Sequence, residues 1–247
     1  MGTHITRTMR TINDRVRAAE ADQSTWWLFH VLRASDSMFP SGSYAHSFAL
    51  EGLVQDGSVC DEITLSDYLE HAFLPAVIGA DVPIAHGAWK AAAIGDVARL
   101  LELDDLANAL RPTRELRDAS RRTGLQRLRT SLELKPHKLV QDFLSQGGIG
   151  HAAVVIGMES ALWQVPARAA MYTLVYQAIA GQVAAACKLI PLGQMAAQRI
   201  LCDRTARVHA ELGAAMHIAP EDAGWFTPLQ DIASAKHERA YARLFIS

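Results

Sequence analysis

The sequence predicts an all-α protein, a single domain of about ten helices around a central buried helix. Apolar residues recur at helical spacing, as in "TLSDYLEHAFLPAVIG", where Leu65, Leu69, Phe73 and Val77 are four apart. Alternating strand patterns are nearly absent, and the one β-like run, "AAVVIG", lies among alanines. The chain has 247 residues, half of them hydrophobic, which is enough to bury a core.

Residues that start or stop helices divide the chain. Proline suits the first turn of a helix and glycine suits its end, so both mark boundaries. In the first half, the expected helices run from Ser24-Thr25 to about Ser35-Asp36, from Tyr44 to about Gln55 with Gly57 as its end, from Thr64 or Ser66 onward, from Asp81-Val82-Pro83 to Gly95-Asp96, and through "VARLLELDDLANAL". In the second half, they run from Pro112-Thr113 to about Leu134, through "GGIGHAAVVIGMESALW", from Pro166 to Pro191, from about Leu192 to His209, and after the loop with Pro220, Gly224 and Pro228.

The central helix is predicted from a run without charge. From Ala169 to Cys187, "AAMYTLVYQAIAGQVAAAC" is long enough to span a bilayer. However, Gln177 and Gln182 lie in its middle, and alanine and glycine outnumber the large aliphatic residues. Because small residues let helices approach closely, the run predicts a buried core helix and no membrane span.

The composition indicates how the chain is divided into domains and in which cellular compartment it works. Residues 1–23 carry four arginines and lack the apolar core of a signal peptide, so they predict a flexible N-terminal extension, with an amphipathic targeting helix as the alternative. Residues 24–247 then form the helical domain. Three cysteines without CxxC spacing favour a reducing, cytoplasmic location. A net charge of -2 gives no general attraction to nucleic acid or to an anionic membrane.

Motifs for nucleotides and metals are incomplete. "GIGHAA", residues 148–153, fits the loose G-x-G-x-x-A pattern, but no clear strand precedes it and no acidic residue follows between Ser160 and Cys202. No GxxxxGK[ST] motif occurs, so the chain is not itself a P-loop GTPase. The ten histidines form no HxH or HExxH pair, and only the fold could bring His46 to His71 or Cys60. No stably bound cofactor is expected.

The stretch "FPSGSYAHSFALEG", residues 39–52, gathers polar side chains after a turn. Ser43 and His46 would share a helical face, as in a hydrolase, but nothing in the sequence orients the imidazole and no GxSxG elbow exists. The favoured interpretation is a helix start that presents Tyr44, Ser47 and Glu51 as a polar stripe for hydrogen bonding across an interface.

The segment 111–129, "RPTRELRDASRRTGLQRLR", holds seven arginines. Arg114, Arg117 and Arg121 fall on one helical face, which suggests a helical nucleic-acid-binding regulator as the alternative function. No aromatic residues are interleaved for base stacking, and the chain as a whole is not basic. A solvated face or a surface for an acidic protein partner is therefore favoured.

Four separated stretches together resemble one family, the urease accessory protein UreF. They are "FPSGSYAHSFALEG", "ELRDAS" with the following "RRTG", "CKLIPLGQMAAQRIL" (residues 187–201) and "DIASAKHERAYARLFIS" (residues 231–247). The stretches occur in the family order. Two departures concern helix packing: Ala49 stands where the family often has glycine, and Ala-Lys precedes His237 where it often has methionine.

The resemblance implies an all-α protein with no catalytic activity of its own. UreF-like proteins form homodimers and bind a second accessory protein, UreD (also called UreH). That complex recruits the GTPase UreG and acts on the urease apoprotein so that nickel enters the active site. Nickel is thus handled by the complex, as cargo, and no partner of the nucleic-acid class is implied.

The residues expected to bind partners come from the matching stretches. They are Pro40, Ser43, Tyr44, His46, Ser47, Glu51, Lys188, Pro191, Gln194, His237, Glu238, Tyr241, Arg243, Leu244 and Phe245. The resemblance suggests that the tail with Arg243 and Leu244 packs on the turn with Tyr44 when UreD binds, forming part of a surface that faces the GTPase. Lys188 is the second candidate, although a lone lysine that ends an uncharged helix commonly just extends its charge to solvent.

Overall fold

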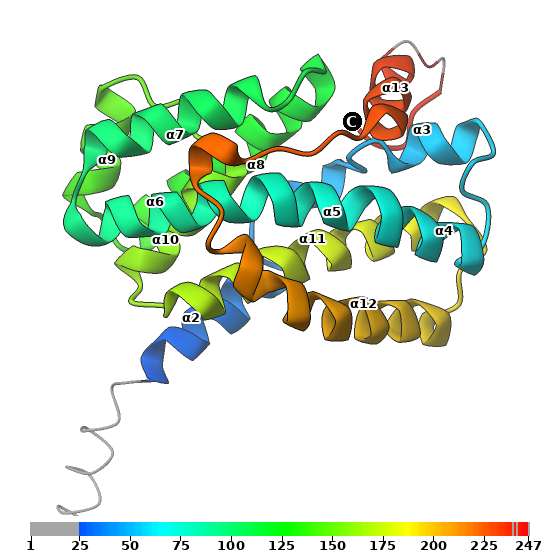
Figure 1. Ribbon diagram of the computed structural model, residues 1–247, viewed down its shortest axis with the longest axis horizontal. Helices are drawn as coiled ribbons and strands as arrows, with labels where there is room; N and C mark the ends of the chain where they lie inside the picture. The colour runs from blue at the N-terminus through cyan, green and yellow to red at the C-terminus, as the bar shows by residue number, and fades with distance from the viewer. Residues whose placement is uncertain (1–24, 239, 241, 247) are drawn as a thin grey trace, which may run out of the picture.

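The computed structural model describes residues 25–238, 240 and 242–246, so the expected flexible extension at 1–23 lies outside the described residues. Within them the chain forms helices and no strand, which confirms the all-α prediction (Figure 1). The α-helices are α2 (Trp26–Ser35), α3 (Leu50–Gln55), α4 (Glu62–Tyr68), α5 (Leu74–Ala76), α6 (Val82–Ile94), α7 (Val97–Ala109), α8 (Arg114–Leu134), α9 (Lys138–Ser145), α10 (Ala152–Leu162), α11 (Ala167–Leu189), α12 (Gln194–Ala215) and α13 (Pro228–His237). Short 3₁₀ turns lie at Ser43–Ala45 and Pro220–Asp222.

Helices α4, α5 and α6 form one continuous run, joined by π-helical turns at Leu69–Phe73 and Val77–Asp81 (Figure 1). Counted as one helix, this run brings the described part of the chain to ten α-helices. The predicted helix start at Asp81-Val82-Pro83 is therefore wrong, because Asp81 has helical dihedral angles. Each π turn ends two residues before a proline, at 75 or 83. Proline lacks the N–H of the regular ladder and would clash with the carbonyl four residues earlier.

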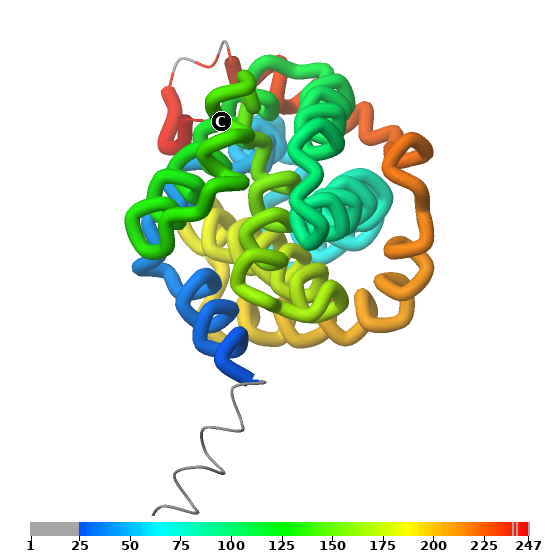
Figure 2. The backbone as a smooth tube through the Cα atoms, turned by 90° about the vertical axis from the view of Figure 1, so that its left-hand side faces the viewer, coloured from blue at the N-terminus to red at the C-terminus, as the bar shows by residue number. Residues whose placement is uncertain are grey.

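One carbonyl released by this arrangement finds a distant partner. Pro83 cannot donate to the oxygen of Gly79, and the backbone N–H of Gly224 does so instead at 3.0 Å. Figure 2 shows the segment that contains Gly224 passing along the outside of the α4–α6 run on its way to α13. The long helix therefore continues through the proline because another segment satisfies its backbone.

The predicted helix from Tyr44 to Gln55 is broken. After the 3₁₀ turn, His46 is extended, and Phe48 and Ala49 have positive φ angles of 50° and 77°, so α3 starts only at Leu50. The break is held from elsewhere, since the side-chain amide of Gln182 in α11 donates to the carbonyl of Ser47 at 2.9 Å. Local propensity favoured a helix here, and tertiary hydrogen bonding prevents it.

The uncharged run forms α11, which packs against α2, α3, α6, α10 and α12 and crosses the molecule between α12 and the α4–α6 run (Figure 1). It ends at Leu189, before Pro191, and its buried face confirms the prediction of a central helix. Gln177 is accommodated because its side-chain amide donates to the carbonyl of Ala34 at 2.8 Å. Among the described helices, none is long and apolar enough to cross a membrane.

Other boundaries follow the sequence closely. Helix α8 covers the predicted span to Leu134, "AAVVIG" lies inside α10, and α12 continues past His209 to Ala215. Helix α10 packs tightly on α6, where a Cβ added at Gly157 would lie 2.1 Å from the carbonyl oxygen of Ala85. Helices α3 and α13 pack together at one end of the molecule, and this pairing positions the candidate site (Figure 1).

Candidate functional site at the C-terminal tail

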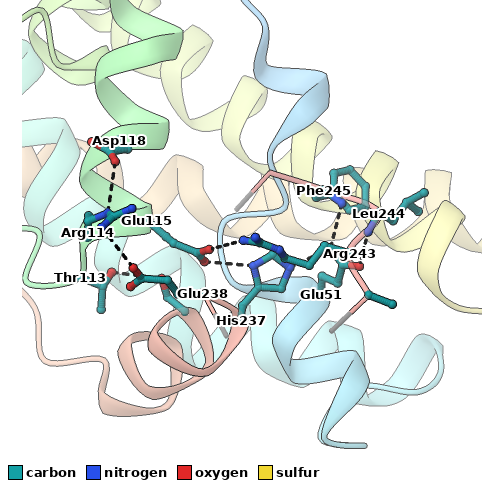
Figure 3. Close-up of polar contacts among 12 residues, drawn as sticks. Glu51, Thr113, Arg114, Glu115, Asp118, His237, Glu238, Arg243, Leu244 and Phe245 are labelled. Atoms are coloured by element: carbon teal, nitrogen blue, oxygen red, sulfur yellow. Dashed lines mark hydrogen bonds and ion pairs between the residues drawn. The ribbon is translucent and has the colours of Figure 1, made fainter. Parts of the chain in front are cut away.

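A buried histidine joins three helices near the end of the chain. His237, the last residue of α13, has a fully buried side chain. Its Nε2 lies 2.9 Å from Oε2 of Glu51 in α3, and its Nδ1 lies 3.0 Å from Oε2 of Glu115 in α8 (Figure 3). The two carboxylates are buried as well, so this ring ties α3, α8 and α13 together by charge-assisted hydrogen bonds.

The same carboxylates hold the C-terminal tail, here residues 242–246. Backbone N–H groups of Leu244 and Phe245 donate to Glu51, at 2.7 Å to Oε1 and 2.9 Å to Oε2 (Figure 3). Nη1 of Arg243 donates to Oε1 of Glu115 at 3.1 Å. The tail is thus fixed by its backbone to α3 and by one side chain to α8.

The tail also contacts the turn segment, residues 39–52. The backbone N–H of Ile246 donates to the carbonyl of Ala45 at 2.8 Å. The ammonium of Lys188, near the end of α11, lies 5.3 Å from the ring centroid of Tyr44 and 5.2 Å from that of Phe245. Both distances suit cation–π attraction, so the turn, the tail and α11 meet at one place.

A cavity of about 650 Å³ lies behind this meeting point. Tyr44, Lys188 and Phe245 line one part of it, and the lining continues to Arg127 and Trp225. Apolar side chains and glutamines make up much of the rest. Within the described part of the chain, no group of three or more histidine, cysteine, aspartate or glutamate side chains is arranged to hold a metal ion.

The structure brings seven of the predicted site residues into this one cluster. They are Tyr44, Glu51, Lys188, His237, Arg243, Leu244 and Phe245. Pro191 lies between α11 and α12, and Gln194 is the first residue of α12; both are outside the hydrogen-bonded cluster, although Gln194 lines the cavity. Glu238 pairs with Arg114 at 3.5 Å, and Tyr241 lies outside the described residues.

The expected polar stripe is wrong as a surface feature. Tyr44 is 52% exposed, but Ser47 and Glu51 are buried, because the chain breaks its helix between them and Glu51 turns towards the tail. In the chain by itself the tail already packs on the turn. Arg243 bonds to Glu115 there, and Lys188, rather than Arg243, lies over the Tyr44 ring.

The serine and histidine of the turn do not form the pair that a hydrolase would use. The Ser43 hydroxyl is 2.9 Å from that of Ser41 at the partly buried start of the turn. His46 is buried, and burial, followed by the charge of Arg122, lowers its pKa to about 4. The accompanying Pro40 is exposed beside them.

Sequence reasoning did not select Glu115, which belongs to the Arg-rich segment. Five of the seven arginines there have partners within the chain: Arg111 with Asp81, Arg114 with Glu238, Arg117 with the carbonyls of Arg111 and Pro112, Arg121 with Asp118, and Arg127 with Glu159. The only signal for Glu115 was a glutamate in the first turn of an otherwise basic helix. These pairings leave less of the segment available to a phosphate backbone.

Comparisons with known proteins agree with the resemblance. The UreF family model matches residues 59–204. A urease accessory protein UreF of Rhodopseudomonas palustris (strain BisA53) is 31% identical over 225 residues, covering 89% of this chain and 93% of the relative. The UreF proteins of Azorhizobium caulinodans and Granulibacter bethesdensis are 32% and 31% identical, covering 85% and 89% of this chain and 90% and 94% of the relatives.

Proposed function

The chain belongs to the UreF family of urease accessory proteins, and we propose that it bridges UreD (UreH) and the GTPase UreG on the urease apoprotein. In this proposal the assembly couples GTP hydrolysis to nickel delivery, and the chain contributes surfaces rather than catalysis. It works as a homodimer in the cytoplasm, and nickel passes through the complex as cargo without a resident site on this chain.

The observation that carries the proposal is that two stretches of the family resemblance, far apart in the sequence, meet in the structure. The turn segment and the tail lie at opposite ends of the chain, yet they meet around Lys188. We name the exposed part of this region the docking surface: Tyr44, Arg243, Leu244 and Ile246, with Lys188 at its edge.

The composition of the docking surface suits protein recognition. Tyrosine and arginine are the residues that most often carry binding energy at interfaces. Leu244 and Ile246 add exposed apolar area next to them, and the Arg243 side chain remains 41% exposed despite its bond to Glu115. An arginine that is half free can exchange or share its carboxylate partner when a second protein approaches.

Recruitment of the GTPase tests the docking surface directly. Arg243→Ala should still bind UreD but should recruit UreG poorly in a pull-down that contains both partners. Arg199→Ala is the matched control, since Arg199 is also an exposed arginine paired with a glutamate, Glu62, but belongs to α12. Normal recruitment of UreG by Arg243→Ala would remove this surface from the proposal.

The wider function is tested by urease activation. Urease subunits are co-expressed with UreD and UreG, with and without this chain, and the nickel content and urea hydrolysis of the purified urease are measured. Both should rise when the chain is present. Equal activation with and without the chain would overturn the accessory role.

A further inference from the structure

We propose that Glu51 and His237 are positioning residues, which set the place of the tail and do not themselves touch a partner. The inference rests on the proposed function only for the use of the docking surface. The positioning is a property of the chain by itself and can be measured without any partner.

The first step is the geometry at Glu51. Its carboxylate is 5% exposed and accepts three hydrogen bonds, from Leu244, Phe245 and His237. Consecutive backbone N–H groups bind different oxygens of the same carboxylate, so the direction of the tail is fixed together with its place (Figure 3). Backbone N–H groups that leave water need such partners, and here one buried side chain supplies them.

The second step is the ring of His237. Both ring nitrogens lie within hydrogen-bond distance of a carboxylate oxygen, so one imidazole holds two acidic side chains from different helices. On one side it holds Glu51, which binds the tail backbone, and on the other it holds Glu115, which binds Arg243. The two carboxylates that hold the tail are therefore both contacted by His237, whereas the bonds of the tail to Ala45 and Gln55 do not involve it.

Among the described residues, the charged groups that face His237 come from three elements. Glu51 faces it from α3, Glu115 from α8, and Arg243 approaches Glu115 from the tail. The neighbouring Glu238 is directed to Arg114. Two carboxylates thus surround the ring and one guanidinium follows them, so removal of the ring would leave two buried carboxylates without this shared partner.

Hydrogen exchange of the tail amides tests the positioning. In the full chain, Glu51→Gln and His237→Gln should each speed exchange at Leu244 and Phe245 about tenfold or more, the factor expected for losing a charge-assisted hydrogen bond. Amides in α10 should be accelerated much less than those of the tail, whatever the change in the midpoint of thermal unfolding. Glu62→Gln is the control, because it removes an exposed carboxylate that binds Arg199.

A conservative variant separates positioning from simple packing. Glu51→Asp keeps a carboxylate but shortens the side chain, whereas Glu51→Gln keeps the shape and removes the charge. If the charge positions the tail, Glu51→Asp should retain more of the protection at Leu244 and Phe245 than Glu51→Gln does. A residue that only filled space between α3 and the tail would give the opposite order.

Two results would overturn the inference: wild-type exchange of the tail in both variants, or equal acceleration throughout α3 and α13 with a lower unfolding midpoint. Failure of the proposed function would look different. If the variants release the tail but still recruit UreG with UreD, the positioning holds and the docking surface is wrong.

Discussion

Two buried histidine clusters in this molecule use the same chemistry in different ways. In the interior, Arg127 of α8 pairs with Glu159 of α10, and Nε2 of His30 in α2 lies 3.9 Å from Oε1 of the same glutamate. At the tail, His237 lies between Glu51 and Glu115. Both clusters remove charge from water, which is costly unless each group is paired.

The clusters differ in how completely they are paired. Nε2 of His30 and Oε1 of Glu159 have no hydrogen-bond partner in the described part of the chain. Every carboxylate oxygen of Glu51 and Glu115, by contrast, accepts at least one hydrogen bond. Packed helices hold the interior cluster in place whatever its hydrogen bonds, whereas the tail has little apolar burial beyond Phe245 and depends on its polar contacts.

The largest expected effect concerns the interior pair. Arg127→Ala would leave Glu159 buried without its cation and should lower the free energy of unfolding by about 3–5 kcal/mol. Arg243→Ala removes a partly exposed arginine and should cost less than about 1 kcal/mol. Urea unfolding at neutral pH measures both variants.

A double variant checks whether the loss comes from the unpaired charge of Glu159. Arg127→Met with Glu159→Leu replaces both charges by apolar side chains and should recover most of the stability lost in Arg127→Ala. Equal losses for Arg127→Ala and Arg243→Ala would erase the proposed distinction between the interior cluster and the tail cluster.

The next contrast uses two glycines at helix crossings. Gly157→Ala would place its Cβ 2.1 Å from the carbonyl oxygen of Ala85, between α10 and α6 in the interior. Gly52→Ala would place it 2.7 Å from the carbonyl oxygen of Ala233, between α3 and α13 at the tail. We expect losses of about 3 and about 1 kcal/mol, because overpacking is tolerated where one partner can shift.

Thermal unfolding of both glycine variants provides the measurement, and tail exchange gives a second one. Gly52→Ala should speed exchange at Leu244, because α13 carries His237 at its end, whereas Gly157→Ala should do so only by unfolding the whole domain. A larger stability loss in Gly52→Ala than in Gly157→Ala would contradict the ranking.

Acid should weaken the interior cluster. Burial, followed by the charge of Arg127, lowers the pKa of His30 from 6.5 to about 3. As pH falls below 6.5, the unfolded chain takes up a proton that the folded chain refuses, so the stabilisation present above 6.5 is progressively lost towards pH 3. The loss from this group should reach about 2 kcal/mol at pH 5.

His30→Leu isolates that contribution. His151 and His46 also have lowered pKa values, so the wild type loses stability in acid for several reasons. The difference between wild type and His30→Leu between pH 6.5 and pH 5, measured by urea unfolding, should therefore shrink by about the amount assigned to His30. Parallel curves would show that His30 takes up its proton equally in both states.

The sequence predicted the interior region better than the tail region. Hydrophobic spacing and prolines located α8 and α11. This worked because the pattern of apolar and charged residues within a helix indicates which of its faces is buried. The break between His46 and Leu50 was not predictable, since no glycine or proline marks it and Ala49 adopts a left-handed backbone held by tertiary contacts. Pro83 looks like a helix start, and only the fold shows that a π turn before it lets the helix continue.

The site was predicted only in part, because its contacts join segments that are far apart in the sequence. The matching stretches named Glu51, His237 and Arg243 but could not say that Glu51 is buried beneath the tail. Glu115 has arginines as sequence neighbours, and local spacing favours pairing with them. Its choice of His237 and Arg243 depends on α13 and the tail returning to α8, which no local pattern encodes.

The smallest expected effect compares two lysines that lie over aromatic rings. Lys188 lies over Tyr44 and Phe245 at the tail, and Lys135 lies 4.8 Å from the ring centroid of Trp163 near the interior cluster. Replacing either by methionine keeps the aliphatic stem and removes the charge, at a cost of about 0.5–1 kcal/mol for a partly exposed cation–π contact.

Because the tail has little apolar burial beyond Phe245, this small loss should be visible there and nowhere else. Lys188→Met should speed exchange at Phe245 about two- to fivefold without moving the unfolding midpoint, since 0.5–1 kcal/mol corresponds to that factor in a local opening equilibrium. Lys135→Met should leave tail exchange unchanged, and Lys188→Arg should restore it because a guanidinium also stacks on aromatic faces. If Lys188→Met exchanges like the wild type, Phe245 is held by its burial and by the Glu51 carboxylate alone, and the difference between the two regions lies entirely in hydrogen bonding.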